Sequence, residues 1–142
     1  MVKEKYGWQE STQPFQRTYR LMSNLDDRYE NGIHDLMKFI KFGYGRGSDH
    51  ASKDIRLGVF DRNKGIEMVL KYDHVVSDDL FYWLEYVGMD ESEFWATADT
   101  FRDPRVWWIE KGEWLKFDID GEIRSYGKVK LAAHLQSNFV RE

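Results

Sequence analysis

The chain has 142 residues, which fits one domain, and 16% of them are aromatic, enough large apolar surface for a packed core. It contains no cysteine, which excludes disulfides and thiolate metal sites and suits a reducing compartment. No apolar run reaches the roughly 18–20 residues of a membrane span, and a net charge of −4 argues against general nucleic-acid binding. We therefore expect a cytoplasmic protein that binds neither membranes nor nucleic acids.

The first 25 residues show no clear hydrophobic period. Pro14 and the polar stretch before it predict an extended arm over residues 1–25. Four aromatic side chains are possible anchors for this arm: Tyr6, Trp8, Phe15 and Tyr19. The arm is expected to pack either on this domain or on a neighbouring one.

A helical domain is predicted over residues 26–104, because caps, apolar stripes and glycine stops alternate there. The first helix runs from Ile33 to about Lys41. Ser48 is a suitable N-cap for a second helix that ends near Leu57, before Gly58. The residues expected to face the core from these two helices are Ile33, Leu36, Met37, Ile40, Ala51 and Ile55.

Three more helices follow in the same domain. Asp61 is the expected cap of the third helix, and Ser77 that of the fourth, which Gly88 ends. Asp90 and Glu93 resemble a capping box at the start of the fifth helix, which stops before Pro104. The apolar residues expected to face the core are Ile66, Val69, Leu70, Leu80, Trp83, Leu84, Val87, Phe94, Ala98 and Phe101.

The pattern then changes from helical to β. Lys111-Gly112 and Asp120-Gly121 are hairpin dipeptides that predict an antiparallel meander over residues 105–127. Residues 128–142 form either a tail or a short helix. The predicted fold class is therefore mainly α: a small bundle of about five helices with an appended short antiparallel β-meander near the C-terminus.

The loop after the first helix is the best candidate for a binding site. Gly43, Gly45 and Gly47 allow backbone N–H groups to approach a ligand, and Arg46 and Ser48 add an anion-binding guanidinium and a helix start. The loop is neither a Walker loop nor a dinucleotide fingerprint. The alternative is an ordinary glycine-rich connection between helices.

The second helix could extend this anion site. Lys53 and Arg56 share one face with Asp49, so the two cations are candidates for phosphate or substrate binding. A solvated face with an Asp49–Lys53 ion pair is the alternative. Trp107, Trp108 and Trp114 could stack on a sugar ring, but we favour their packing the meander onto the helices.

No catalytic or metal site is predicted in this chain. The four histidines lack zinc-binding spacing, and helix capping explains the paired carboxylates. His50, after the glycine loop, and His34, beside Asp35, are the candidates if the chain were a small stand-alone enzyme. That hypothesis requires a deep pocket around one of them.

Several segments in order resemble one family. They are residues 5–8 (KYGW), 25–27 (LDD), 41–48 (KFGYGRGS), 51–58 (ASKDIRLG), 65–67 (GIE), 71–73 (KYD) and 86–95 (YVGMDESEFW). Together they resemble the carboxyl-terminal region of the N-acetyl sugar amidotransferases of bacterial lipopolysaccharide O-antigen and nonulosonic-acid synthesis. That family belongs to the PP-loop ATP pyrophosphatase class.

The resemblance implies a function shared with other domains. Family members use ATP, with Mg, in a PP-loop domain to replace an acetamido oxygen by ammonia, which a glutaminase-type subunit supplies. The Ser-Gly-Gly-x-Asp-Ser loop that holds pyrophosphate does not occur in residues 1–142. The chain is therefore expected to be a non-catalytic C-terminal domain or a truncated member, which helps to bind a nucleotide-sugar or docks on the PP-loop domain or the glutaminase.

An alternative is a ligand-free interaction or homodimerisation module, which would present the aromatic side chains of the arm to a partner.

Overall fold

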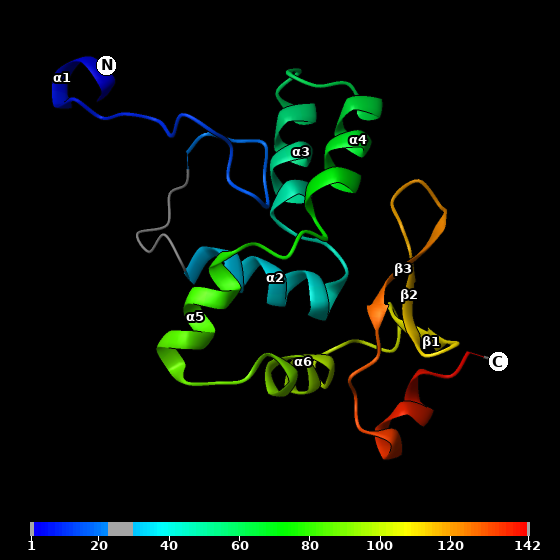
Figure 1. Ribbon diagram of the computed structural model, residues 1–142. Coiled ribbons are helices and arrows are strands. Elements are labelled where there is room, and N and C mark those ends of the chain that lie inside the picture. The colour runs from blue at the N-terminus through cyan, green and yellow to red at the C-terminus, as the bar shows by residue number, and fades with distance from the viewer. Residues whose placement is uncertain (1, 23–29, 142) are drawn as a thin grey trace.

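The computed structural model describes residues 2–22 and 30–141 of the chain (Figure 1). The expected boundary between arm and helical domain, at residues 25 and 26, and the 25–27 segment of the resemblance lie outside this part. The described residues form helices α1 to α6, three strands and a final 3-10 helix. The predicted fold class, mainly α with an appended β-meander near the C-terminus, is confirmed.

Three helices build the first hydrophobic core. They are α2 (Glu30–Phe42), α5 (Asp79–Val87) and α6 (Glu91–Asp99). The core consists of Ile33, Leu36, Ile40, Leu80, Leu84, Phe94 and Ala98, with Met37 and Trp83 packed against it. These are nine of the predicted core residues, so the 3.6-residue periodicity correctly identified the buried stripes. The predictions for Val87 and Phe101 are wrong, because both side chains are exposed.

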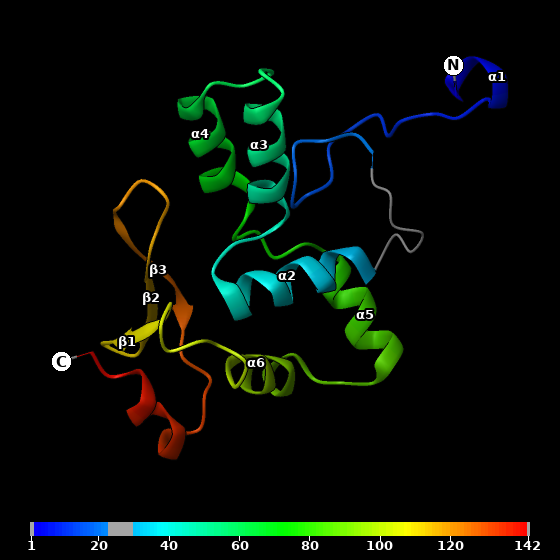
Figure 2. The ribbon, with the colours of Figure 1, turned by 180° about the vertical axis from the view of Figure 1, so that it is seen from behind.

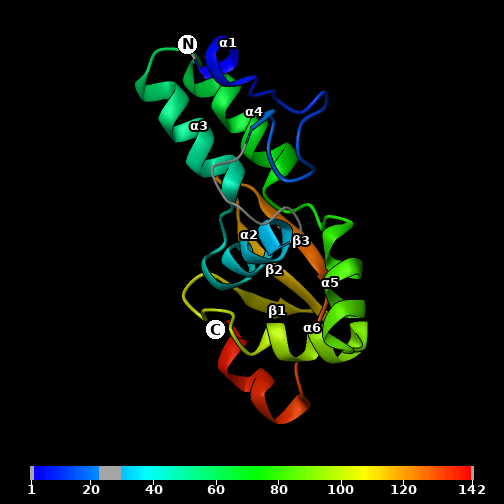
Figure 3. The ribbon, with the colours of Figure 1, turned by 90° about the vertical axis from the view of Figure 1, so that its left-hand side faces the viewer.

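Helices α3 (Arg46–Arg56) and α4 (Arg62–Tyr72) form a hairpin on the other side of α2. Figures 1 and 3 show this hairpin standing apart from α5 and α6. The two helices pack through Ala51, Gly65 and Met68, all buried. Ile55, expected in the core, is partly exposed, because it lies over Gly65 at the edge of the hairpin.

The observed caps of α4, α5 and α6 agree only in part with the capping predictions. Asp61 caps α4 by accepting a hydrogen bond from the backbone N–H of Lys64 (2.7 Å), and Gly88 ends α5 in the left-handed conformation, as predicted. Ser77 does not cap α5, because Asp78 takes the N-cap position. Asp90 precedes α6 as predicted, but its side chain makes no cap hydrogen bond, so the capping box with Glu93 is absent.

The meander comprises β1 (Trp108–Glu110), β2 (Glu113–Phe117) and β3 (Ile123–Lys128), paired antiparallel in that order. Lys111 and Gly112 both have positive φ angles, as a two-residue hairpin turn requires. The C-terminal segment ends in a 3-10 helix, Ala133–Phe139. This decides the question left open for residues 128–142 in favour of a short helix.

A second core joins the meander to α2. It contains Phe39, Trp107, Trp114, Leu131 and Phe139. Trp107 and Trp114 are fully buried, so they pack the meander onto the helices, as favoured above, and are unavailable to a sugar. The guanidinium of Arg102 lies between these two rings and pairs with Asp99 (2.9 Å). Figure 2 shows the meander and the C-terminal segment from behind.

The arm begins with a short helix, α1 (Val2–Tyr6), and then runs to the side of α3 (Figure 1). Tyr19 packs against His50, Phe60 and Tyr72. The arm therefore packs on this domain, which is one of the two outcomes considered for it. None of the helices in the described ranges is long and apolar enough to span a bilayer.

Candidate functional site

The glycine loop connects α2 to α3 beneath the meander. Gly43 ends α2 with a φ of +77°, and its N–H donates to the Phe39 carbonyl (2.7 Å). A Cβ at Gly43 would lie 2.6 Å from a methyl group of Val106, just before β1. Gly43 is therefore needed for both the backbone conformation and the close approach of the meander.

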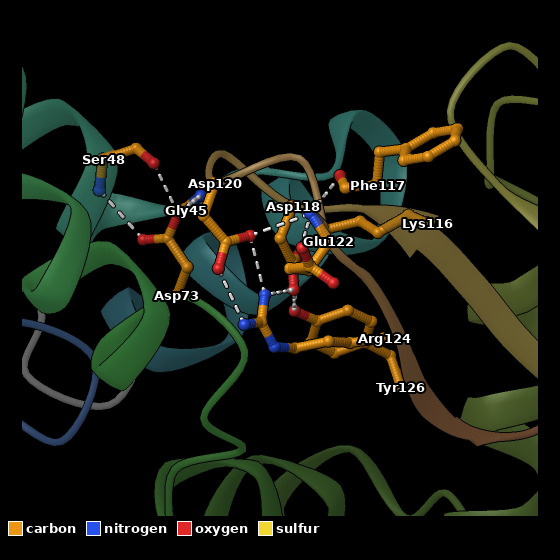
Figure 4. A network of polar contacts seen from close by, with 10 residues as sticks. All are labelled: Gly45, Ser48, Asp73, Lys116, Phe117, Asp118, Asp120, Glu122, Arg124 and Tyr126. Atoms are coloured by element: carbon orange, nitrogen blue, oxygen red, sulfur yellow. Dashed lines mark hydrogen bonds and ion pairs between the residues drawn. The ribbon is translucent and has the colours of Figure 1, made fainter.

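The start of α3 already holds a carboxylate of the same chain. Asp73, which is buried at the end of α4, accepts hydrogen bonds from the N–H of Gly45 (2.9 Å) and the N–H of Ser48 (2.9 Å). The hydroxyl of Ser48 also donates to it (2.6 Å), as Figure 4 shows. A carboxylate is stabilised at a helix start by the free N–H groups and the helix dipole.

The prediction that Ser48 is the N-cap of α3 is therefore wrong. The helix begins three residues earlier than predicted, at Arg46, with Gly45 in the N-cap position. Asp73 supplies the acceptor that a capping side chain would have provided, so Ser48 takes part as a donor within the first turn.

Two glycines allow Asp73 to come this close. A Cβ at Gly47 would lie 2.7 Å from the Asp73 Oδ1 atom, and one at Gly45 would lie 3.2 Å from the Asp73 carbonyl oxygen. In this structure, the anion next to the glycine loop is thus the carboxylate of Asp73.

Arg46 pairs with a second buried carboxylate. Its Nε donates to both carboxylate oxygens of Asp35 (3.1 Å each), and its Nη2 lies 3.0 Å from Oδ1. The Arg46 side chain remains 20% exposed. The contacts with Asp35 engage Nε and Nη2 of the guanidinium, and not Nη1.

Arg17 of the arm lies between these two carboxylates. Its Nη2 donates to the backbone carbonyls of Asp35 (3.0 Å) and Asp73 (2.7 Å), while Nε and Nη1 are buried without a partner among the described residues. Burial lowers the pKa of Arg17 to about 10, against the nearby negative charges of Asp35 and Asp73. The side chain therefore stays positively charged at neutral pH.

Three further arm residues form hydrogen bonds with side chains of α3. The Thr18 hydroxyl contacts the His50 Nδ1 atom, and the hydroxyl of Tyr19 and the guanidinium of Arg20 both bond to Asp54. Burial, followed by the positive charges of Arg20 and Arg46, lowers the pKa of His50 to about 4. His50 is therefore neutral near pH 7.

A cavity of about 790 Å³ lies between the arm and helices α2, α3 and α5. Such a volume falls within the range of roughly 300–1,000 Å³ that small-molecule sites usually have. Its polar lining includes Arg17, Asp35, Arg46, His50, Ser77 and Asp78. The cavity therefore brings Arg46, a predicted site residue, together with Arg17, for which the sequence carried no signal.

The predicted site residues do not all converge. Gly43 faces the meander, and Gly45, Gly47 and Ser48 surround Asp73. Lys53 and Arg56 are exposed on α3, and Arg56 lines a different, more apolar groove of about 500 Å³ between α3 and α4. Asp49 pairs with Lys38 of α2, so the alternative Asp49–Lys53 pair does not form.

The other polar cluster belongs to the meander (Figure 4). Asp118 is bonded by Lys116 (2.6 Å), Arg124 (2.8 Å) and the Tyr126 hydroxyl (2.6 Å). Burial raises the pKa of the Asp118 carboxyl, but these hydrogen bonds outweigh it and hold the pKa below its usual range. With all three donors engaged, the cluster ties β2 to β3.

No group of histidines and carboxylates among the described residues could hold a metal ion.

A family model matches most of the chain. The family model described as "LPS biosynthesis protein WbpG-like, C-terminal domain" matches residues 5–120. No curated protein matches the sequence. The matched range includes the described arm from residue 5 onward, the glycine loop, helices α2 to α6 and the first two strands.

Proposed function

Because the chain belongs to the family of WbpG-like C-terminal domains of LPS biosynthesis proteins, we propose that it is the non-catalytic C-terminal part of an N-acetyl sugar amidotransferase and helps to bind the nucleotide-sugar substrate. The cavity between the arm and helices α2, α3 and α5 carries this proposal. It is large enough for much of a nucleotide-sugar, and Arg46 lies in its wall.

In this proposal Arg46 contacts a phosphate of the substrate with its Nη1 edge, while Asp35 holds the guanidinium in place. The glycine loop acts through Asp73, which fixes the start of α3 and so the position of Arg46. Lys53 and Arg56 lie outside the cavity, on the same helix, and would add long-range attraction for the diphosphate.

The amidotransfer itself is assigned to other parts of the system. We expect ATP and Mg to bind a PP-loop ATP pyrophosphatase domain and a glutaminase-type subunit to deliver ammonia. This chain alone is expected to release no pyrophosphate from ATP. We place the reaction in the cytoplasm, and the bacterial surface polysaccharide that it serves would be an O-antigen.

Calorimetric titration of a UDP-N-acetyl sugar, with the PP-loop domain supplied, tests the proposal. Arg46→Ala should weaken binding about tenfold or more, since one charge-assisted contact is removed. The double variant Arg46→Ala/Asp35→Asn avoids leaving a buried carboxylate unpaired. Lys64→Ala, on the exposed side of α4, serves as the charge-matched control. Equal affinity of the wild type and both Arg46 variants would remove Arg46 from the site.

A second candidate function is docking on the PP-loop domain or the glutaminase. The aromatic face of α5 favours it, because Phe81, Tyr82 and Tyr86 are all exposed, Tyr86 to 89%. Light scattering of mixtures should then detect a complex that Tyr86→Ser weakens, with Ile123→Ser on β3, another exposed apolar residue, as control. A dimer of the chain alone would instead favour the homodimerisation module.

A further inference from the structure

Two buried polar groups in the wall of the cavity have no partner among the described residues. They are the Nε and Nη1 atoms of Arg17 and the hydroxyl of Ser77, and both residues are only 3% exposed. Buried donors without acceptors are uncommon in proteins, because each loses its hydrogen bonds to water. Two of them beside one cavity point to a ligand that supplies the missing partners.

Arg17 also makes no ion pair with a carboxylate among the described residues. Its Nη2 bonds only to backbone carbonyls, since the carboxylate of Asp35 is occupied by Arg46 and that of Asp73 by the start of α3. The neighbouring His50 is neutral and supplies no further charge. A buried cation in this position is best completed by an oxyanion.

The part of the cavity around Ser77 has a different chemistry. Ser77 lies beside Gly32 of α2, where a Cβ would come within 2.3 Å of the hydroxyl and 2.5 Å of a carboxylate oxygen of Asp79. Asp78 and Asp79 also line the cavity. Their negative charges repel an anion, whereas hydroxyl groups of a ligand could be bonded by the hydroxyl and carboxylates there.

We propose that the cavity orients a glycosyl phosphate, with Arg17 receiving the phosphoryl oxygens and Ser77 bonding a hydroxyl of the sugar ring. The identity of the ligand as a substrate sugar rests on the proposed function, while the anion site at Arg17 does not. Both free nitrogens of Arg17 are screened from solvent, so its side chain must turn toward the cavity when the ligand enters. Arg17 is thus a substrate-binding residue contributed by the arm.

The first test uses the wild-type chain and two probes, inorganic pyrophosphate and N-acetylglucosamine 1-phosphate. In a nitrogen-15 NMR titration, the Nε–H signal of Arg17 should shift with both probes, whereas that of Arg20, paired with Asp54 outside the cavity, should not. An Arg17 signal that stays unchanged at probe concentrations that shift other signals of the cavity residues would overturn the proposal. This test needs no variant to fold.

The second test compares matched variants. Arg17→Lys keeps the charge but loses the planar fork, so it should weaken both probes about tenfold or more. Ser77→Ala should weaken N-acetylglucosamine 1-phosphate several-fold and leave pyrophosphate unchanged, because only the sugar uses the hydroxyl. Arg20→Gln loosens the arm without touching the cavity and controls for arm detachment. Wild-type affinities in both Arg17→Lys and Ser77→Ala would contradict the assignment.

The outcomes also separate this inference from the proposed function. A UDP-N-acetyl sugar that binds Arg17→Lys as tightly as the wild type would leave nucleotide-sugar binding in place and refute the role of Arg17. Conversely, the two probes could bind in an Arg17-dependent way while no UDP-N-acetyl sugar binds. That result would uphold the anion site and refute the nucleotide-sugar function.

Discussion

The carboxylate of Asp73 bonds both the backbone N–H (2.9 Å) and the hydroxyl (2.6 Å) of Ser48, which lies 25 residues earlier in the chain. This contact joins the end of α4 to the first turn of α3, and the Asp73 side chain is buried. The glycine loop is consequently shaped around an internal anion, and the cavity that we assign to the ligand lies beside it.

Replacement of Asp73 should destabilise the protein. Asp73→Ala leaves the N–H groups of Gly45 and Ser48 without their acceptor, so we expect a loss of about 2–4 kcal/mol in the free energy of unfolding. Denaturant unfolding measures it, and amide exchange should accelerate at Gly45 and Ser48. Asp61→Ala, which removes the exposed cap of α4, is the control and should cost about 1 kcal/mol. Equal losses in the two variants would contradict a special role for Asp73.

Gly47→Ala should also destabilise the protein, although alanine favours helices by about 1 kcal/mol over glycine. The new Cβ would lie 2.7 Å from Asp73 Oδ1 and would push the carboxylate away from α3. We expect a net loss of about 1–3 kcal/mol in unfolding experiments. In the Gly47→Ala/Asp73→Ala double variant the losses should not add, because both act on one contact. A more stable Gly47→Ala protein would show that the clash is relieved at little cost.

His50 should make stability depend on pH. Its pKa in the folded chain, about 4, lies below the ordinary value of 6.5, so the unfolded chain binds the proton more readily. The associated stability is complete above pH 6.5 and is lost as the pH falls toward 4. After allowance for solvent screening of a half-buried ring, the change is on the order of 1–2 kcal/mol.

Unfolding free energies measured between pH 7 and pH 4 test this expectation. The charged groups around the ring are Arg20 and Arg46, which lower its pKa, and Asp49 and Asp54, which raise it. His50→Gln should show a flatter pH profile than the wild type. Identical profiles would assign the pH dependence to other groups.

The buried pair of Asp99 and Arg102 should matter far more than a surface pair. Asp99→Ala leaves the Arg102 guanidinium buried between two tryptophans without its carboxylate, so we expect a loss of about 3–5 kcal/mol. Asp103→Ala breaks the pair with the exposed side chain of Arg105 and should cost much less than Asp99→Ala. Tryptophan fluorescence during denaturation follows both, and similar losses would contradict the structural role of the buried pair.

The fold class and most of the elements follow from the amino-acid sequence alone. Apolar residues at helical spacing identified the buried faces of α2, α5 and α6. Gly88 correctly predicted the end of α5, and Lys111-Gly112 correctly predicted the turn between β1 and β2. These signals are local, since a periodic stripe or a left-handed residue acts within a few positions of the chain. The prediction of Ser48 and Ser77 as caps misplaces the starts of α3 and α5.

The assembly of the candidate site, in contrast, depends on contacts between residues far apart in the chain. Arg17 reaches the carbonyl of Asp73 across 56 positions, and the loop receives its carboxylate from another helix. No local period or motif predicts such contacts, because they depend on how the arm and the α3–α4 hairpin pack around α2. The sequence therefore specified a glycine loop suited to an anion, whereas the packing determined that Asp73 fills it and that Arg17 and Arg46 line the neighbouring cavity.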